Sequence, residues 1–113
     1  PNGNDLVATV MFEIDDADKR HLFLSDIGGV ENSFVLEIDG DSITATPEDD
    51  VERTNEAGKA SSVQFIHFQL SDAQITKFKK ADARVMVGIN HPNYGHMTIL
   101  PEVSRAALAQ DIQ

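Results

Sequence analysis

The chain has 113 residues, enough for one domain with a hydrophobic core of its own, and 41% of them are hydrophobic. Its net charge of −10 opposes nucleic-acid binding, which depends on lysine and arginine neutralising phosphates, and its lack of cysteine excludes disulfides and thiolate metal sites. No apolar run approaches the roughly 18 residues of a membrane helix and no signal peptide is visible, so residues 1–113 are expected to form one cytoplasmic domain without a membrane partner.

The amino-terminal part predicts a strand followed by a helix. Residues 6–14 alternate apolar side chains with others, which is typical of a strand. Asp15 or Asp16 can cap a helix that runs to about Ile27. The pair Gly28-Gly29 ends this helix, because glycine adopts the left-handed conformation without steric cost.

A hairpin and a polar connection come next. Residues 31–38 alternate cleanly, and Asp39-Gly40 is a favoured pair for a two-residue type I′ turn. Residues 42–46 are therefore expected to return as the partner strand. Residues 47–61 then form a long acidic connection without periodicity, and connections of this length are often functional.

Residues 63–70 form the most strand-like run in the chain, and we expect them at the centre of a sheet. Ser71 and Gln74 make a capping box, in which each side chain bonds the backbone N–H of the other residue. Leu70 and Ile75 stand where a hydrophobic staple requires them. A second helix is therefore predicted to begin at Ser71.

The last third predicts two strands and a closing helix. Residues 82–89 and 97–100 flank a turn at residues 91–96, and Pro101 suits the first turn of a helix. The full order is β-α-β-β-β-α-β-β-α. This order predicts an α+β fold with a mostly antiparallel sheet and two or three helices packed on one face.

The most reactive side chains gather in the turn His91-Pro92-Asn93-Tyr94-Gly95-His96. If Pro92 to Gly95 form a four-residue loop, His91 and His96 become a cross-strand pair with Cβ atoms about 4.5–5.5 Å apart. A structural zinc site needs four ligands, however, and nothing in the sequence places His67 beside the turn. We therefore predict no metal and no cofactor, and expect these side chains to order the turn through hydrogen bonds to the backbone.

Two stretches carry a resemblance to a known family: residues 52–56 (ERTNE) leading to residues 59–70 (KASSVQFIHFQL), and residues 88–96 (GINHPNYGH). Together they resemble an uncharacterised bacterial family, a domain of unknown function often encoded beside rubrerythrin-like and iron–sulfur oxidoreductase proteins. The resemblance covers nearly the whole chain and implies that it corresponds to the carboxy-terminal part of a longer family protein.

The chain departs from the family pattern at three positions. His67 stands where the resemblance implies arginine, Gln64 where histidine is usual, and Asn90 where aspartate is common. A histidine–carboxylate site in the family would be incomplete in this chain. The family has no established activity, so none is implied.

Two functions remain open. The first is a non-enzymatic binding or accessory domain that acts with a redox-related protein partner. We also expect a homodimer, because Val7 and Met11 leave an apolar face on the first strand. The alternative is a small enzyme or metal-binding domain centred on the turn, with a candidate cluster of His91, Tyr94, His96, His67, Arg53 and Lys59, the last two supplying anion-binding charge.

Overall fold

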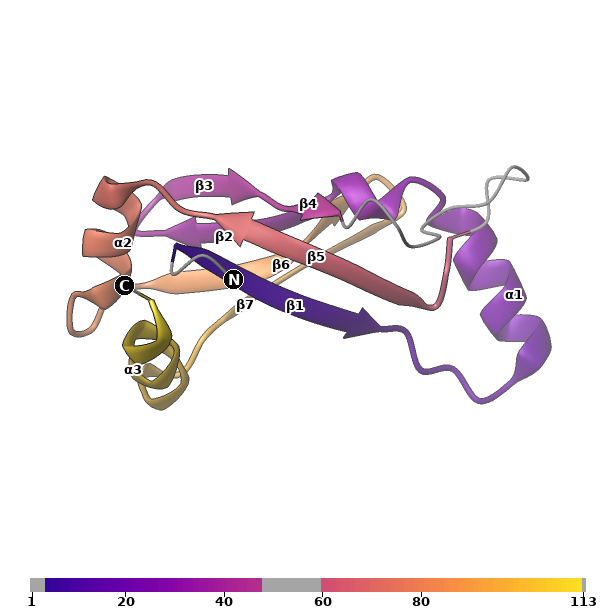
Figure 1. Cartoon of the computed structure of the whole chain (residues 1–113). Coiled ribbons are helices and arrows are strands. Elements are labelled where there is room, and N and C mark those ends of the chain that lie inside the picture. The colour runs from indigo at the N-terminus through magenta and orange to yellow at the C-terminus, as the bar shows by residue number, and fades with distance from the viewer. Residues whose placement is uncertain (1–3, 48–59, 113) are drawn as a thin grey trace.

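The protein is an elongated α+β domain of 44 × 26 × 22 Å, seen in a computed structural model that describes residues 4–47 and 60–112 (Figure 1). The described elements are, in chain order, β1 (Asp5–Met11), α1 (Ala17–Asp26), a 3₁₀ turn (Val30–Asn32), β2 (Phe34–Ile38), β3 (Asp41–Thr44), β4 (Thr46–Pro47), β5 (Val63–Gln69), α2 (Asp72–Lys79), β6 (Val85–His91), β7 (Tyr94–Ile99) and α3 (Glu102–Asp111). The α+β class and the predicted order of the elements are confirmed. The long connection at residues 47–61 lies mostly outside the described residues.

The strands form two antiparallel sheets, one in the order β1-β5-β4 and the other in the order β3-β2-β6-β7. The chain changes sheet at Ala45: Thr44 pairs with Val35 of β2, whereas Thr46 pairs with His67 of β5. The single strand predicted over residues 42–46 is therefore divided between the two sheets. Figure 1 shows α1 at one end of the long axis and α2 and α3 at the other.

The hydrophobic core lies between the sheets and continues beneath the helices. Its side chains alternate along β2 and β5, as the sequence predicts for strands with one buried face. The most completely buried large side chains include Ile27, Ile38, Ile66, Leu70 and Phe78.

The local signals in the sequence are confirmed. Asp16 caps α1 by accepting a hydrogen bond from the Lys19 amide at 2.9 Å. Both Asp39 and Gly40 have positive φ angles, 48° and 91°, as a type I′ turn requires. The capping box at the start of α2 has both of its bonds, with Ser71 as the cap. The described helices do not include one that is long and apolar enough to cross a membrane.

Candidate functional site

The histidine turn is a two-residue hairpin at the end of β6 and β7. His91 pairs with Tyr94, so that only Pro92 and Asn93 form the tip. The predicted four-residue loop is wrong, and so is the predicted His91–His96 pair, because His96 lies opposite Ile89. The shorter loop brings Tyr94 onto the core side of β7, and burial of that ring favours this register.

His91 uses both of its ring nitrogens within the fold. Nδ1 lies 3.0 Å from the backbone N–H of Asn93, which must donate. Nε2 therefore carries the proton, and it donates to the carbonyl oxygen of Gly28 at 2.9 Å. Neither nitrogen has a lone pair left for a metal ion, and the His91 ring orders the turn through hydrogen bonds to the backbone.

Asn93 adds a second tie between the hairpin and the end of α1. Its side-chain Nδ2 donates to the carbonyl oxygen of Asp26 at 2.8 Å. This carbonyl belongs to the last turn of α1, where backbone oxygens have no partner within the helix. The hairpin tip therefore caps the helix from outside and is held against it.

Aromatic rings fill the space beneath the hairpin. Tyr94 meets Phe23 at a centroid distance of 5.2 Å and Phe12 at 6.3 Å, in both cases edge to face. Phe12 and Phe23 lie 5.5 Å apart. Such pairs stabilise a fold by about 0.5–1.5 kcal/mol each beyond the area that they bury. Tyr94 is therefore part of a packed cluster that joins β7, α1 and the residue that follows β1.

The remaining candidate residues do not converge on this turn. His96 is exposed, and its ring lies tilted by 53° against that of Tyr94 at a centroid distance of 4.5 Å. It lines a surface hollow of about 310 Å³ to which His91 does not contribute. His67 belongs to the other sheet, opposite Val7 and Thr46. Arg53 and Lys59 lie outside the described residues. Within residues 4–47 and 60–112, no three His, Cys, Asp or Glu side chains are grouped closely enough to hold a metal ion.

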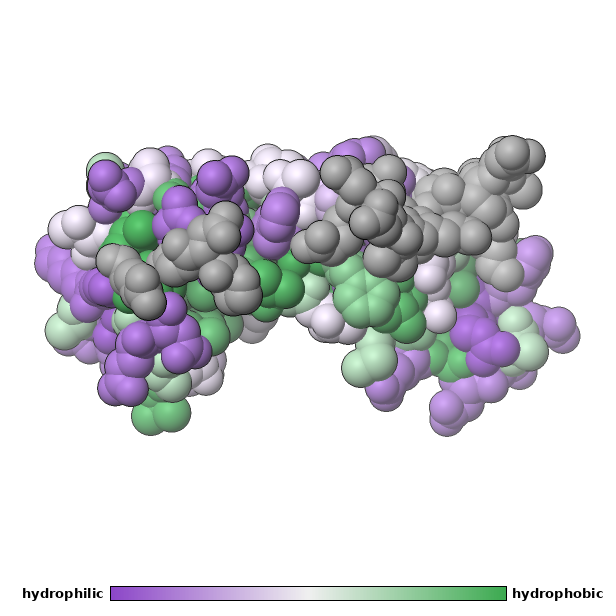
Figure 2. Space-filling model, viewed as in Figure 1, coloured by the Kyte–Doolittle hydropathy of each residue, from purple (hydrophilic) through white to green (hydrophobic). Residues whose placement is uncertain are grey.

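A second surface is apolar and exposed: the outer face of the β1–β5 pair. Three consecutive cross-strand pairs form it, namely Val7–His67, Thr9–Phe65 and Met11–Val63. Val7 is 58% exposed, Met11 60% and Phe65 38%. Figure 2, which looks onto β1 and β5, shows green hydrophobic residues along the middle of this face. Val7 and Met11 agree with the apolar face expected on the first strand, and the alternation of side chains from Val63 adds Phe65 to it.

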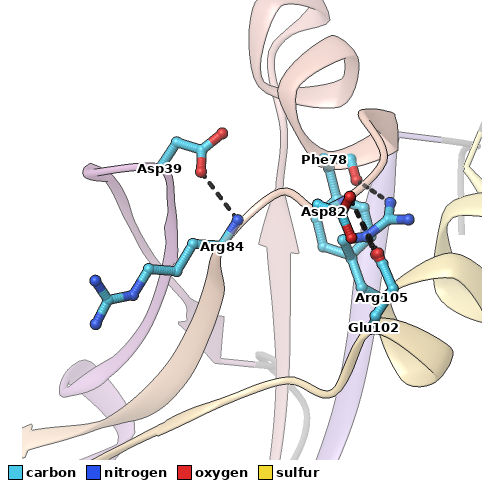
Figure 3. Close-up of polar contacts among 6 residues, drawn as sticks. All are labelled: Asp39, Phe78, Asp82, Arg84, Glu102 and Arg105. Carbon is cyan, nitrogen blue, oxygen red and sulfur yellow. Dashed lines mark hydrogen bonds and ion pairs between the residues drawn. The ribbon is translucent and has the colours of Figure 1, made fainter.

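A polar network holds the opposite end of the molecule together (Figure 3). The buried Arg105 donates from Nη1 to the carbonyl oxygen of Phe78 at 2.7 Å and from Nε to Glu102. Glu102 also accepts from the backbone N–H of Asp82 at 3.0 Å. The hydrogen bond from Arg105 and the one from Asp82 hold the pKa of the Glu102 carboxyl below its usual range. These bonds join α3 to the end of α2 and to the segment that follows it, so their role is to stabilise the packing of the two helices.

Known proteins place the chain in a family without assigning it a function. No curated protein matches it. It is similar to a crystal structure described as a novel protein of unknown function from Burkholderia pseudomallei K96243, with a TM-score of 0.86 and 31% identity. That match covers 100% of this chain and 58% of the other, so the chain spans less than two thirds of the length of its relative. The model of the family described as "Protein of unknown function (DUF3501)" matches residues 1–112, and the chain belongs to this family.

Proposed function

We propose that this protein is a non-enzymatic binding or accessory domain that docks on a protein partner through the outer face of the β1–β5 pair. The observation that carries the proposal is the exposure of Val7, Met11 and Phe65 side by side on one sheet face. Contiguous apolar surface is unfavourable in water and often marks an interaction site. Large aromatic and methionine side chains are also enriched where proteins meet.

The charge distribution supports the same face. The chain carries 19 acidic and 9 basic residues, yet the three pairs Val7–His67, Thr9–Phe65 and Met11–Val63 contain no Asp, Glu, Lys or Arg. A net charge of −10 repels proteins of like charge from most of the surface. Approach through an uncharged face avoids both that repulsion and the cost of burying an unpaired charge.

The partner that we propose is a redox-related protein. This part of the proposal is based on the resemblance to a family that is often encoded beside rubrerythrin-like and iron–sulfur oxidoreductase proteins. We also propose that the chain corresponds to the carboxy-terminal part of a longer family protein, which is what the resemblance implies. The relative from Burkholderia is longer than this chain, as this proposal requires.

Titration calorimetry with each oxidoreductase encoded beside the gene tests the proposal. The natural chain should bind one of them with a saturable isotherm, and Phe65→Asp should abolish the binding because it places a charge at the centre of the docking face. Leu22→Asp is the matched control: Leu22 is 66% exposed on α1, away from this face, and its replacement should preserve the affinity.

Two outcomes would contradict the proposal. One is that none of these oxidoreductases binds the natural chain. The other is that Phe65→Asp and Leu22→Asp change the affinity equally. Circular dichroism of both variants separates a lost interface from a lost fold, because each side chain is exposed and its replacement should leave the core intact.

A further inference from the structure

One side of the molecule, between β1 and α3, is open and apolar. A hollow of about 130 Å³ lies there, with a lining that is almost entirely hydrophobic. We name it the β1–α3 groove, and its lining includes Leu6, Ala8, Phe68, Val87, Leu100 and Leu108. Val7 also lines it and is the residue that the groove shares with the outer face of the β1–β5 pair. Dry cavities of about 150 Å³ with a similar lining accept a molecule the size of benzene, so this groove has room for about one apolar side chain.

The strand beside this groove has a hydrogen-bonding edge that no other described strand pairs with. Within the described residues, β1 pairs with β5 alone. The amide of Leu70 donates to the carbonyl oxygen of Asn4 at 2.9 Å, and the amide of Phe12 donates to the carbonyl oxygen of Ser62 at 2.8 Å. These two bonds show which residues of β1 form the hydrogen-bonded pairs with β5. Even-numbered residues of β1 therefore bond to β5, and the N–H and C=O groups of Val7 and Thr9 point to the open edge.

Natural edge strands usually carry a lysine, a proline or a bulge that prevents another strand from pairing with them. The sequence of β1, DLVATVM, has neither a lysine nor a proline, and its register with β5 is continuous from Asp5 to Met11. The only charged side chain in β1 is Asp5, at its start. This edge is therefore suited to accept a strand.

Polypeptide that could supply such a strand exists in the family. The chain covers 58% of its Burkholderia relative, which leaves 42% of that protein outside the match. Asn4 stands two residues before Leu6, and Ile112 follows Leu108 by four residues, so both ends of the described chain are near the groove in sequence. Figure 1 shows the start of β1 and α3 at the same end of the molecule.

We propose that the β1–α3 groove receives an extended segment of the polypeptide that longer family members carry outside the part matched here. This segment adds a strand to the edge of β1 by bonding the backbone of Val7 and Thr9, and inserts one apolar side chain between β1 and α3. The inference goes beyond the proposed function, which concerns the outer face of the β1–β5 pair and a separate protein.

Hydrogen exchange in the full-length Burkholderia relative is the first test. Amides aligned with Ala8 and Val10 bond to β5 in either case and serve as internal references. Amides aligned with Val7 and Thr9 should exchange as slowly as these references if a strand covers the edge. Fast exchange at Val7 and Thr9 beside slow exchange at Ala8 and Val10 would overturn the proposal.

The second test uses the 113-residue chain and synthetic peptides that span the unmatched 42% of the relative. One peptide should shift the amide resonances of Val7 and Thr9 in a saturable way. Leu108→Lys, which places a charge in the groove, should abolish these shifts. Val103→Lys should preserve them, because Val103 lies on the same helix, is 82% exposed and does not line the groove.

Further variants separate this proposal from its alternatives. Thr9→Pro should weaken peptide binding while retaining the pairing with β5, because the Thr9 amide points to the open edge. Phe65→Asp should leave peptide binding unchanged, because Phe65 does not line the groove. Peptide binding therefore tests the groove separately from the proposed docking of a partner on the outer face. The proposal is overturned if no peptide shifts Val7 and Thr9. It is also overturned if these amides shift with protein concentration alone in the Phe65→Asp variant, whose outer face cannot pair with a second copy, because a second copy would then occupy the groove.

Discussion

His91 donates a hydrogen bond from Nε2 to the carbonyl oxygen of Gly28 across 63 residues of sequence, at 2.9 Å. The bond joins the tip of the β6–β7 hairpin to the segment that follows α1. The imidazole also accepts a bond from Asn93, so the ring fixes the turn and its docking together. His91, a candidate metal ligand in the sequence, therefore has a structural role: it holds the hairpin tip against the end of α1.

Replacing His91 with alanine should lower the free energy of unfolding by about 1–3 kcal/mol, since two hydrogen bonds of roughly 1 kcal/mol each are lost. His96→Ala is the control. It should change stability by less than about 0.5 kcal/mol, because the side chain is exposed. Urea denaturation of the two variants measures the difference. A larger loss of stability in His96→Ala than in His91→Ala would contradict the structural role assigned to His91.

Micromolar zinc should leave the melting temperature of the natural chain unchanged. A ligand that binds only the native state raises this temperature by mass action. Both ring nitrogens of His91 are already bonded, and His96 lies opposite Ile89 in the register. Scanning calorimetry with and without zinc measures the effect. A rise that disappears in the His91→Ala, His96→Ala double variant would restore the metal-binding alternative.

Gly88→Ala should destabilise the β6–β7 pair, with a loss of about 1–3 kcal/mol as for other overpacked sites. A Cβ atom at Gly88 would lie 2.7 Å from the Cα of Met97 and 2.5 Å from its sulfur, closer than real contacts allow. Gly95→Ala is the matched control on the neighbouring strand, where the nearest atoms are 4.0 Å away. Thermal unfolding compares them, and equal losses would contradict the steric explanation.

Acid should weaken the contact between α2 and α3 through Glu102. The hydrogen bond from Arg105 lowers the pKa of Glu102 in the folded chain below its usual 4.5. The carboxylate therefore contributes stability that is complete above this value and is lost as the pH falls through the depressed pKa. Glu102→Gln should flatten the acid side of a stability-against-pH curve, and an unchanged curve would contradict this role.

Local signals in the sequence predicted much of the fold. Ser71 with Gln74, Asp39 with Gly40, and Asp16 each act through a hydrogen bond or a backbone angle set by a few neighbouring residues. Such interactions can be recognised without knowledge of the rest of the chain.

The division into two sheets and the hairpin register could not be predicted in the same way. The change of sheet at Ala45 depends on where β5 lies, and β5 is a distant part of the sequence. The register of His91 depends on Tyr94 packing against Phe12, which follows β1, and against Phe23 of α1. Periodicity gives the face of each side chain but not the long-range partner that selects one register over the next.

In the absence of a partner, the outer face of the β1–β5 pair should associate with a second copy of the chain. Pairing two copies through this face removes Val7, Met11 and Phe65 from water, and each Å² of apolar surface that is buried contributes about 25 cal/mol. No Asp, Glu, Lys or Arg in the three cross-strand pairs opposes this contact. Sedimentation equilibrium should therefore detect a homodimer of the natural chain and a monomer of Phe65→Asp, while Leu22→Asp remains dimeric. A natural chain that stays monomeric at high concentration would show that this face does not bind a second copy.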